Sequence, residues 1–376
     1  MHNIKSNFTR LTIGCSLALA VCISASASAA PSEAPILHVY NWSDYISEQA
    51  IAGFTKKTGI KVVYDVYDSN ETLEAKLLAG KSGYDLVFSA ARPYAARQIK
   101  AKLLRPLDKL KLPQIGNADA SLMKSLSDID PGNRFTVPYM WGTTGLGYNE
   151  AKVRAALGPD VPLDSWQMLF NPANSKKLAG CGISMLDDEA EGLGATLVAL
   201  GKPPQSARPA DLDAAAASIR AIKPQLRYFH SSRYISDLAS GDICLAMGYS
   251  GDIIQAAARA VEAKNGVVVK YVIPKEGAVR WMDLMVIPRD SERPNNAHAF
   301  INYLLTPSVI AQISDEIGYA NANAAATQLV SAEVRNNPGV YPPAEVAAKL
   351  VDQTEVSPAD KRKRVRLWTS LKAGRK

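Results

Sequence analysis

The sequence predicts an α/β fold in which a parallel sheet is covered by helices. Near its start the chain alternates strand, helix, strand, helix and strand, at residues 37–40, 47–57, 60–66, 69–79 and 85–88. A second set of such elements follows Val137. The chain has 376 residues, of which 47% are hydrophobic and 21% charged, and this length indicates two lobes or domains rather than one small core.

Local signals support each of the early elements. The three strand segments are short and β-prone, and the one at 60–66 is rich in Val and Tyr. Residues 47–57 show helical spacing and stop before Gly59. Ser69 or Asn70 is expected to cap the next helix, which should run through Ala79.

Later elements follow from the same signals. Helices are expected at 212–222, 253–264 and 296–305, and strands at 243–247, 267–273 and 284–287. The alanine-rich segment 210–217 predicts a surface helix of high propensity, and the last sixteen residues a helix or a frayed tail.

Residues 1–29 have the order of an export signal. A basic polar start precedes the apolar run 11–23, and small residues follow up to Ala29, after which we expect cleavage. A buried N-terminal helix is the alternative. The apolar run is too short to span a bilayer, so an exported, soluble protein is predicted.

The charge and the cysteines narrow the class of protein further. Eight of the 43 Lys and Arg residues lie between Lys361 and Lys376, so the remaining chain is slightly acidic and no nucleic-acid partner is expected. After export two cysteines remain, Cys181 and Cys244. They form either a disulfide, which an oxidising compartment permits, or two buried thiols.

Several common chemistries lack their motifs. The sequence has no H-E-x-x-H, no C-x-x-C and no phosphate-binding P-loop. Residues 248–252 miss the serine nucleophile elbow, because Asp252 stands where a glycine belongs. We therefore expect no metal, no cofactor and no catalytic residues, and binding is favoured over catalysis.

Carboxylates recur beside aromatic residues. The clusters are Trp42-Ser43-Asp44-Tyr45, Tyr249-Ser250-Gly251-Asp252 and Trp281-Met282-Asp283, and Tyr319 lies in a Gly/Asn/Ala-rich segment. The first two clusters follow strands, where open α/β sheets bind ligands. A carboxylate accepts charged hydrogen bonds and a ring face attracts a cation. The pattern therefore predicts a pocket for an organic ammonium ion.

Each of these acids also has a purely structural explanation. Asp44 could be a turn former, and Asp252 could only cap the following helix. Glu191 reads as a solvated acid from the residues alone. Asp283 interrupts an apolar strand, where a charge is costly unless it is exposed or paired, and this favours a functional role. Trp141 and Trp166 are expected to be packing residues.

At these residues the sequence resembles the periplasmic polyamine-binding proteins of bacterial ABC importers, above all the putrescine-binding type. The matching stretches include HVYNWSDYI at 38–46, VPYMWGTTGLGYN at 137–149, YFHSSRYISDLASGDIC at 228–244 and YANANAAAT at 319–327. The resemblance implies a two-lobe periplasmic binding protein fold of type II, with hinge-connected lobes and a ligand cleft between them. Lobe 1 would comprise 30–137 plus 281–318, and lobe 2 would comprise 138–280 plus 319–376.

The resemblance also implies a set of ligand residues and agrees with the disulfide. The ligand residues would be Trp42, Ser43, Asp44, Tyr45, Glu191, Tyr249, Asp252, Trp281, Asp283 and Tyr319. Many relatives carry a Pro-Ser pair after the strand at 85–88, whereas this chain has one residue extra there. Either Ser89 takes over that contact or the contact is lost. Tyr249 stands where putrescine-binding relatives usually carry Trp. Trp281 stands where they often carry Phe.

The resemblance predicts a monomeric periplasmic protein that captures a polyamine by lobe closure and delivers it to an inner-membrane ABC permease. Putrescine is expected first, with spermidine or a related diamine as alternatives. Two other functions stay open, an exported carboxylate-dependent hydrolase and a polyamine-sensing receptor. We expect binding to weaken near pH 4, where unperturbed carboxylates titrate.

Overall fold

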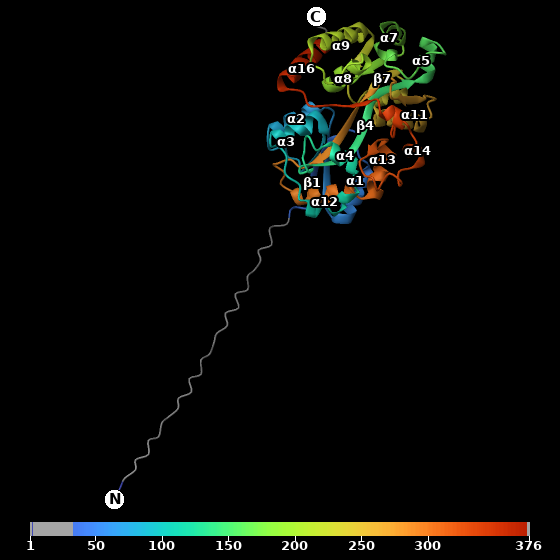
Figure 1. The fold of residues 1–376 in the computed structure, drawn as a ribbon. Helices are drawn as coiled ribbons and strands as arrows, with labels where there is room; N and C mark the ends of the chain where they lie inside the picture. The colour runs from blue at the N-terminus through green and yellow to red at the C-terminus, as the bar shows by residue number, and fades with distance from the viewer. Residues whose placement is uncertain (1, 3–32, 374–376) are drawn as a thin grey trace. The chain divides into compact units, whose positions relative to one another are not determined.

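The computed structural model describes residues 33–373, together with His2. The predicted export signal at 1–29 otherwise lies outside the described residues. From residue 33 on, helices and strands alternate along the chain (Figure 1). None of the described helices is both long and apolar enough to cross a membrane.

The described strands form one connected sheet. Its main order is β2 (Lys61–Tyr67), β1 (Ile36–Trp42), β3 (Leu86–Ala90), β9 (Ala278–Val286), β4 (Thr136–Asn149), β7 (Leu245–Tyr249), β5 (Ile183–Met185) and β6 (Leu226–Phe229). Three further strands pair with the two central ones: β8 (Val269–Val272) and β10 (Ala320–Asn321) with β4, and β11 (Leu350–Asp352) with β9. β1 is parallel to β2 and β3, and β5 is parallel to β6 and β7, whereas β4 and β9 run antiparallel to each other between these sets.

The helices surround this sheet. They are α1 (Glu48–Thr58), α2 (Asn70–Leu78), α3 (Ala96–Lys100), α4 (Ala120–Ser125), α5 (Glu150–Leu157), α6 (Gln167–Phe170), α7 (Pro172–Leu178) and α8 (Glu189–Ala199). The second half of the chain adds α9 (Pro209–Ile222), α10 (Tyr234–Ser240), α11 (Ser250–Glu262), α12 (Pro294–Leu304), α13 (Pro307–Ile317), α14 (Ala332–Arg335), α15 (Ala344–Ala347) and α16 (Pro358–Ala373).

The early elements form as their local signals predict. Ser47 caps α1 by accepting a hydrogen bond from the amide of Ala50 at 3.0 Å, and Gly59 ends the helix in the left-handed region with φ 74°. Of the two candidate caps for α2, Ser69 is the one that caps it. The strand expected at 284–287 begins earlier, at Ala278, and so includes Trp281 and Asp283.

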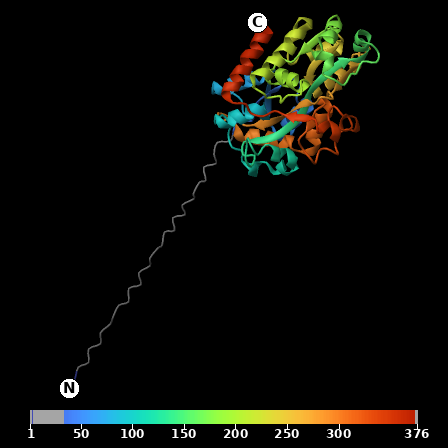
Figure 2. The ribbon, with the colours of Figure 1, turned by 45° about the horizontal axis from the view of Figure 1, so that its top comes forward.

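The structure corrects one expectation for the helices and decides between the two alternatives of another. The alanine-rich helix α9 is not simply a surface helix, because Ala215, Ala216 and Ile219 are buried against α8 and α16. For the C-terminal segment, the helical alternative is confirmed through residue 373. This segment forms α16, which buries Trp368 and Leu371 in the same cluster and lies beside the yellow-green helices in Figure 2.

The buried apolar side chains form two groups of clusters. The first group draws on residues 37–140 and 284–340, and the second on residues 146–269 together with Trp368 and Leu371. β4 contributes to both, with Val137 in the first group and Leu146 in the second. The predicted disulfide between Cys181 and Cys244 is confirmed, with 5.4 Å between the Cα atoms.

Candidate functional site

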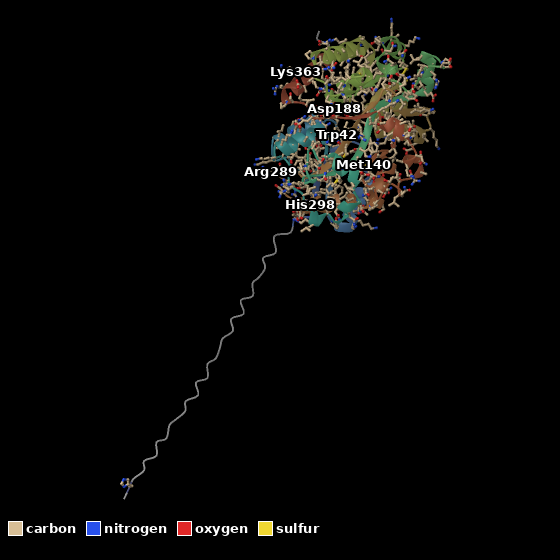
Figure 3. The ribbon with its side chains drawn as sticks, in the orientation of Figure 1. Trp42, Met140, Asp188, Arg289, His298 and Lys363 are labelled. Carbon is tan, nitrogen blue, oxygen red and sulfur yellow. A yellow bond between two sulfur atoms is a disulfide. The ribbon has the colours of Figure 1, made fainter. Side chains whose placement is uncertain are left out.

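A cavity lies where the carboxyl ends of both sets of parallel strands meet. Its walls come from the segments that follow β1, β2 and β3, from those that follow β5, β6 and β7, and from β9 itself. Trp42, at the end of β1, and Asp188, after β5, are labelled near each other in Figure 3. This is the position at which parallel α/β sheets bind ligands.

The cavity brings together most of the residues that the sequence singles out. Those that line it are Trp42, Ser43, Tyr45, Glu191, Tyr249, Asp252, Trp281, Asp283 and Tyr319. Asp44 and Ser89 are not among its lining residues.

Asp44 and Ser89 are neighbours in the chain of residues that line the cavity, but they do not line it themselves. Asp44 adopts a left-handed conformation with φ 54°, and its carboxylate pairs with Arg259 at 2.8 Å, which fits the turn-forming alternative. Ser89 is fully buried in β3, and its hydroxyl has no hydrogen-bond partner among the described residues.

Asp252 lies in the first turn of α11 but does not act as its side-chain cap. One carboxylate oxygen accepts a hydrogen bond from the Tyr234 hydroxyl at 2.6 Å, and the other accepts one from the Tyr319 hydroxyl at 2.5 Å. Burial raises the pKa of Asp252 to about 6, although both hydroxyl contacts oppose the rise. The two tyrosines therefore hold the carboxylate in a fixed orientation at the cavity wall.

Asp283 faces the cavity from β9. Burial raises its pKa to about 7, while the neighbouring Tyr45 hydroxyl and Trp42 indole lower it. Glycine at position 142 of β4 leaves room for the Trp281 ring, because a Cβ there would collide with it. Trp281 and Asp283 are two residues apart on one strand, so their side chains share one face of the sheet.

Glu191 forms the opposite acidic wall together with Asp188. Asp188 caps α8 by accepting from the Glu191 amide at 3.0 Å. The Glu191 carboxylate accepts from the Thr144 hydroxyl and from the Gln353 amide, each at 2.6 Å. Burial raises the pKa of both acids, and their mutual repulsion adds to the rise for Glu191.

Aromatic rings fill the space between the acids. Trp42 and Tyr67 have ring centroids 4.5 Å apart, and the Trp281 ring lies edge-on to Tyr249 at 5.5 Å and to Tyr319 at 5.4 Å. The indole N–H groups of Trp42 and Trp281 are buried and have no protein partner among the described residues. The cavity thus presents ring faces suited to an aliphatic chain or a cation.

Sequence reasoning missed part of the lining. The additional residues are Tyr67, Asp68, Asn70, Ala90, Arg92, Tyr94, Asp188, Ala190, Ser231, Ser232, Ile235 and Gln353. Asp188 could have been found, because Asp188-x-x-Glu191 has the spacing of a capping box and therefore marks a helix start after a strand. The others lie on strands, helices and loops and carry no comparable local signal.

The cavity is rich in acidic side chains. Asp188, Glu191, Asp252 and Asp283 are 4%, 5%, 8% and 4% exposed, so all four acids are buried. The cationic Arg92 also lines the cavity, but it pairs with Asp128 and donates to the Ser125 carbonyl at 2.7 Å. The described residues contain no cluster of three or more side chains suited to a metal ion. The arrangement suits an organic cation.

Comparison with known proteins shows the family. Residues 49–342 match the family described as bacterial extracellular solute-binding protein. The chain is 52% identical over 359 residues to the putrescine-binding periplasmic protein SpuD of Pseudomonas aeruginosa, covering 96% of this chain and 98% of that protein. It is also 52% identical over 344 residues to the putrescine-binding periplasmic protein PotF of Escherichia coli, covering 91% and 93%.

Solved structures agree with this assignment. The spermidine/putrescine ABC transporter substrate-binding protein PotD from Streptococcus pneumoniae aligns with a TM-score of 0.72 and 28% identity, over 91% of this chain and 99% of that one. The TpPotD lipoprotein of Treponema pallidum aligns with a TM-score of 0.74 and 28% identity, over 90% and 99%. The predicted solute-binding protein fold is confirmed, and the relatives' names agree with the expected periplasmic location. The chain therefore belongs to the bacterial extracellular solute-binding proteins, a family that binds its solutes rather than transforming them.

Proposed function

We propose that the protein captures putrescine in this cavity, as a monomer in the periplasm, and delivers it to an inner-membrane ABC importer. The observation that carries the proposal is the set of four buried carboxylates in an aromatic cavity whose one lining arginine already pairs with Asp128. Buried charges are costly unless they are paired. A ligand that brings two positive charges would supply the missing partners.

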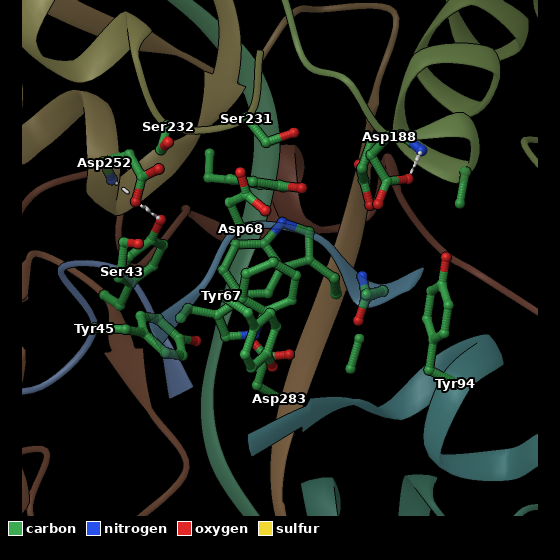
Figure 4. A pocket seen from close by; sticks show the side chains of 18 of the residues that line it. Ser43, Tyr45, Tyr67, Asp68, Tyr94, Asp188, Ser231, Ser232, Asp252 and Asp283 are labelled. Atoms are coloured by element: carbon green, nitrogen blue, oxygen red, sulfur yellow. Dashed lines mark hydrogen bonds between the residues drawn. The ribbon is translucent and has the colours of Figure 1, made fainter. Parts of the chain in front are cut away.

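The distribution of the acids favours a diamine over a single cation. In the close view of the cavity, Asp252 and Asp188 lie at opposite sides and Asp283 lies between them at the lower edge (Figure 4). Aromatic rings occupy the middle. A ligand with a cation at each end and methylenes between matches this order, because carboxylates bind the ends and ring faces pack on the chain.

The names of the relatives favour putrescine over the other amines. Both relatives at 52% identity are named for putrescine, whereas a relative at 40% is a putrescine/agmatine-binding protein and relatives at 33% are spermidine/putrescine-binding proteins. A tetramethylene chain with a cationic nitrogen group at each end is common to all of these ligands.

The proposed mechanism is capture by closure of two lobes. The two groups of apolar clusters support such a division, with β4 and β9 as the connecting strands. Residues 319–340 pack with the first group, so we place this segment in lobe 1 rather than in lobe 2 as expected from the sequence. A ligand that bridges acids from both lobes binds the closed form better and shifts the population towards it.

The experiment is titration calorimetry with putrescine, cadaverine, agmatine, spermidine and spermine. Putrescine is expected to bind with one site per chain and the highest affinity. Absence of binding for all five amines would refute the proposal. Mass spectrometry of the recovered ligand tests the alternative hydrolase, which would return a changed molecule. Uptake by vesicles that contain the cognate permease separates transport from sensing.

A further inference from the structure

A cluster of charged side chains lies directly behind the acidic wall of the cavity. Its centre is Lys361 in the first turns of α16, a residue that does not line the cavity itself. The Lys361 ammonium is 2.6 Å from a carboxylate oxygen of Glu189, the residue next to Asp188. Arg364, one turn further along α16, pairs with the other oxygen of Glu189 at 2.5 Å.

Lys361 also reaches elements that belong to the other side of the cavity. Its ammonium is 3.8 Å from a carboxylate oxygen of Glu71 on α2 and 5.5 Å from the ring centroid of Tyr94. The Tyr94 hydroxyl donates to the same Glu71 oxygen at 2.5 Å, and the Tyr94 ring lines the cavity. Lys361 therefore links the helix that carries Glu191 to the ring that faces it.

α16 does not need this lysine to stay on α8. Trp368 and Leu371 already bury the helix against α8 and α9, and the Arg364–Glu189 pair is almost completely buried, at 3% and 4% exposure. The additional contribution of Lys361 is its contact with Glu71 and Tyr94. Its side chain is 18% exposed and that of Glu71 is 47% exposed, so water screens their interaction only in part.

We propose that Lys361 is a positioning residue for ligand binding, which holds the α8 wall of the cavity against Tyr94 and Glu71 in the closed form. The inference rests on the proposed function, because it assumes that a cationic ligand binds between these walls. A ligand can shift the closed form only through contacts that are better made there. Contacts between the two walls that form without the ligand also stabilise the closed form.

The test compares Lys361→Met with two matched variants. Met keeps the aliphatic stem and removes the charge, Lys361→Arg keeps the charge, and Lys363→Met removes an exposed lysine of the same helix that pairs only with Asp360 among the described residues. Lys361→Met is expected to weaken putrescine binding about three- to tenfold and to speed dissociation. Lys361→Arg should restore most of the affinity, and Lys363→Met should leave it unchanged.

The direction of the change in affinity distinguishes a positioning role from a direct electrostatic effect of the Lys361 charge on the ligand. Removing a positive charge near the cavity would by itself strengthen the binding of a cation. Unchanged or tighter binding by Lys361→Met would therefore overturn the proposal. If the wild-type protein binds none of the amines, it is the proposed function that fails instead.

A double-mutant cycle with Glu71→Gln adds a readout that does not depend on the stability of one variant. The Glu71 side chain is 47% exposed and Gln can still accept from Tyr94, so this variant is expected to fold. The effects of Lys361→Met and Glu71→Gln on affinity should be clearly less than additive. Additive effects would show that the two residues act separately and would overturn the proposal even if Lys361→Met proves less stable.

Discussion

Replacing Asp283 by Asn tests whether buried charge pairing holds the ligand. Asp283 is 4% exposed, and burial raises its pKa to about 7. A hydrogen bond from an ammonium group to a buried carboxylate contributes about 1.5–3 kcal/mol. Asn accepts the hydrogen bond but lacks the charge, so the loss should reach about 1.4 kcal/mol or more, which is at least about tenfold in Kd.

The assay is calorimetric titration of putrescine into the wild type, Asp283→Asn and the control Asp213→Asn, an exposed acid on α9. Thermal unfolding of the ligand-free proteins accompanies it. Asn removes a costly buried charge, so the ligand-free variant should be at least as stable as the wild type. Wild-type affinity in Asp283→Asn would show that this carboxylate does not meet a cationic group of the ligand.

Three further predictions rest on the same geometry. The carboxylates must be ionised to bind a cation but have raised pKa values, about 6 for Asp252 and about 7 for Asp283, so binding releases protons. Burial raises the pKa values of Asp188 and Glu191 as well, so affinity should begin to fall above pH 7 and continue to fall to about pH 6, well above the pH 4 expected from the sequence. Calorimetry in buffers of different ionisation enthalpy measures the release, and constant affinity down to about pH 5 would contradict it. Tyr234→Phe removes a donor to Asp252 at 2.6 Å, which should raise the pKa of that acid further and weaken binding about three- to tenfold at neutral pH. An unchanged affinity and pH profile would show that the Tyr234 hydroxyl does not contribute to ligand binding. Cys181→Ser removes the disulfide, which closes a loop with a sequence separation of 63. The chain-entropy model predicts that this disulfide contributes about 4 kcal/mol to the free energy of unfolding. Urea unfolding should show a loss of that order, and equal stability would mean that the bridge constrains little.

The sequence predicted the local elements where local chemistry decides them. Ser47 and Gly59 bound α1 as expected, since capping and left-handed turns depend on a few neighbouring residues. The burial of α9 was not predictable in this way. Its alanines are compatible with either solvent or packing, and only the arrival of α16 from the end of the chain buries them.

The candidate site shows the same division. Acids beside aromatic residues, after a strand for Asp252 and within one for Asp283, singled out two residues that line the cavity, because a charge at such positions is costly unless it is exposed or paired. Asp188 was missed because a run of acidic residues in a sequence suggests a solvent-exposed segment. Only the packing of the helix that follows Asp188 buries this residue. The pairing of Asp44 with Arg259, far away in the chain, was likewise outside the reach of local patterns.

The central strand β9 contributes residues to the cavity and is also one of the two strands that would connect the proposed lobes. Trp281 and Asp283 lie on β9, which pairs with β3 on one side of the sheet and with β4 on the other. If the protein functions as proposed, a bound amine would touch the strand that would have to bend when the two lobes open. Amines of different length would then hold this strand at different curvatures, so that a transporter could distinguish between them after capture.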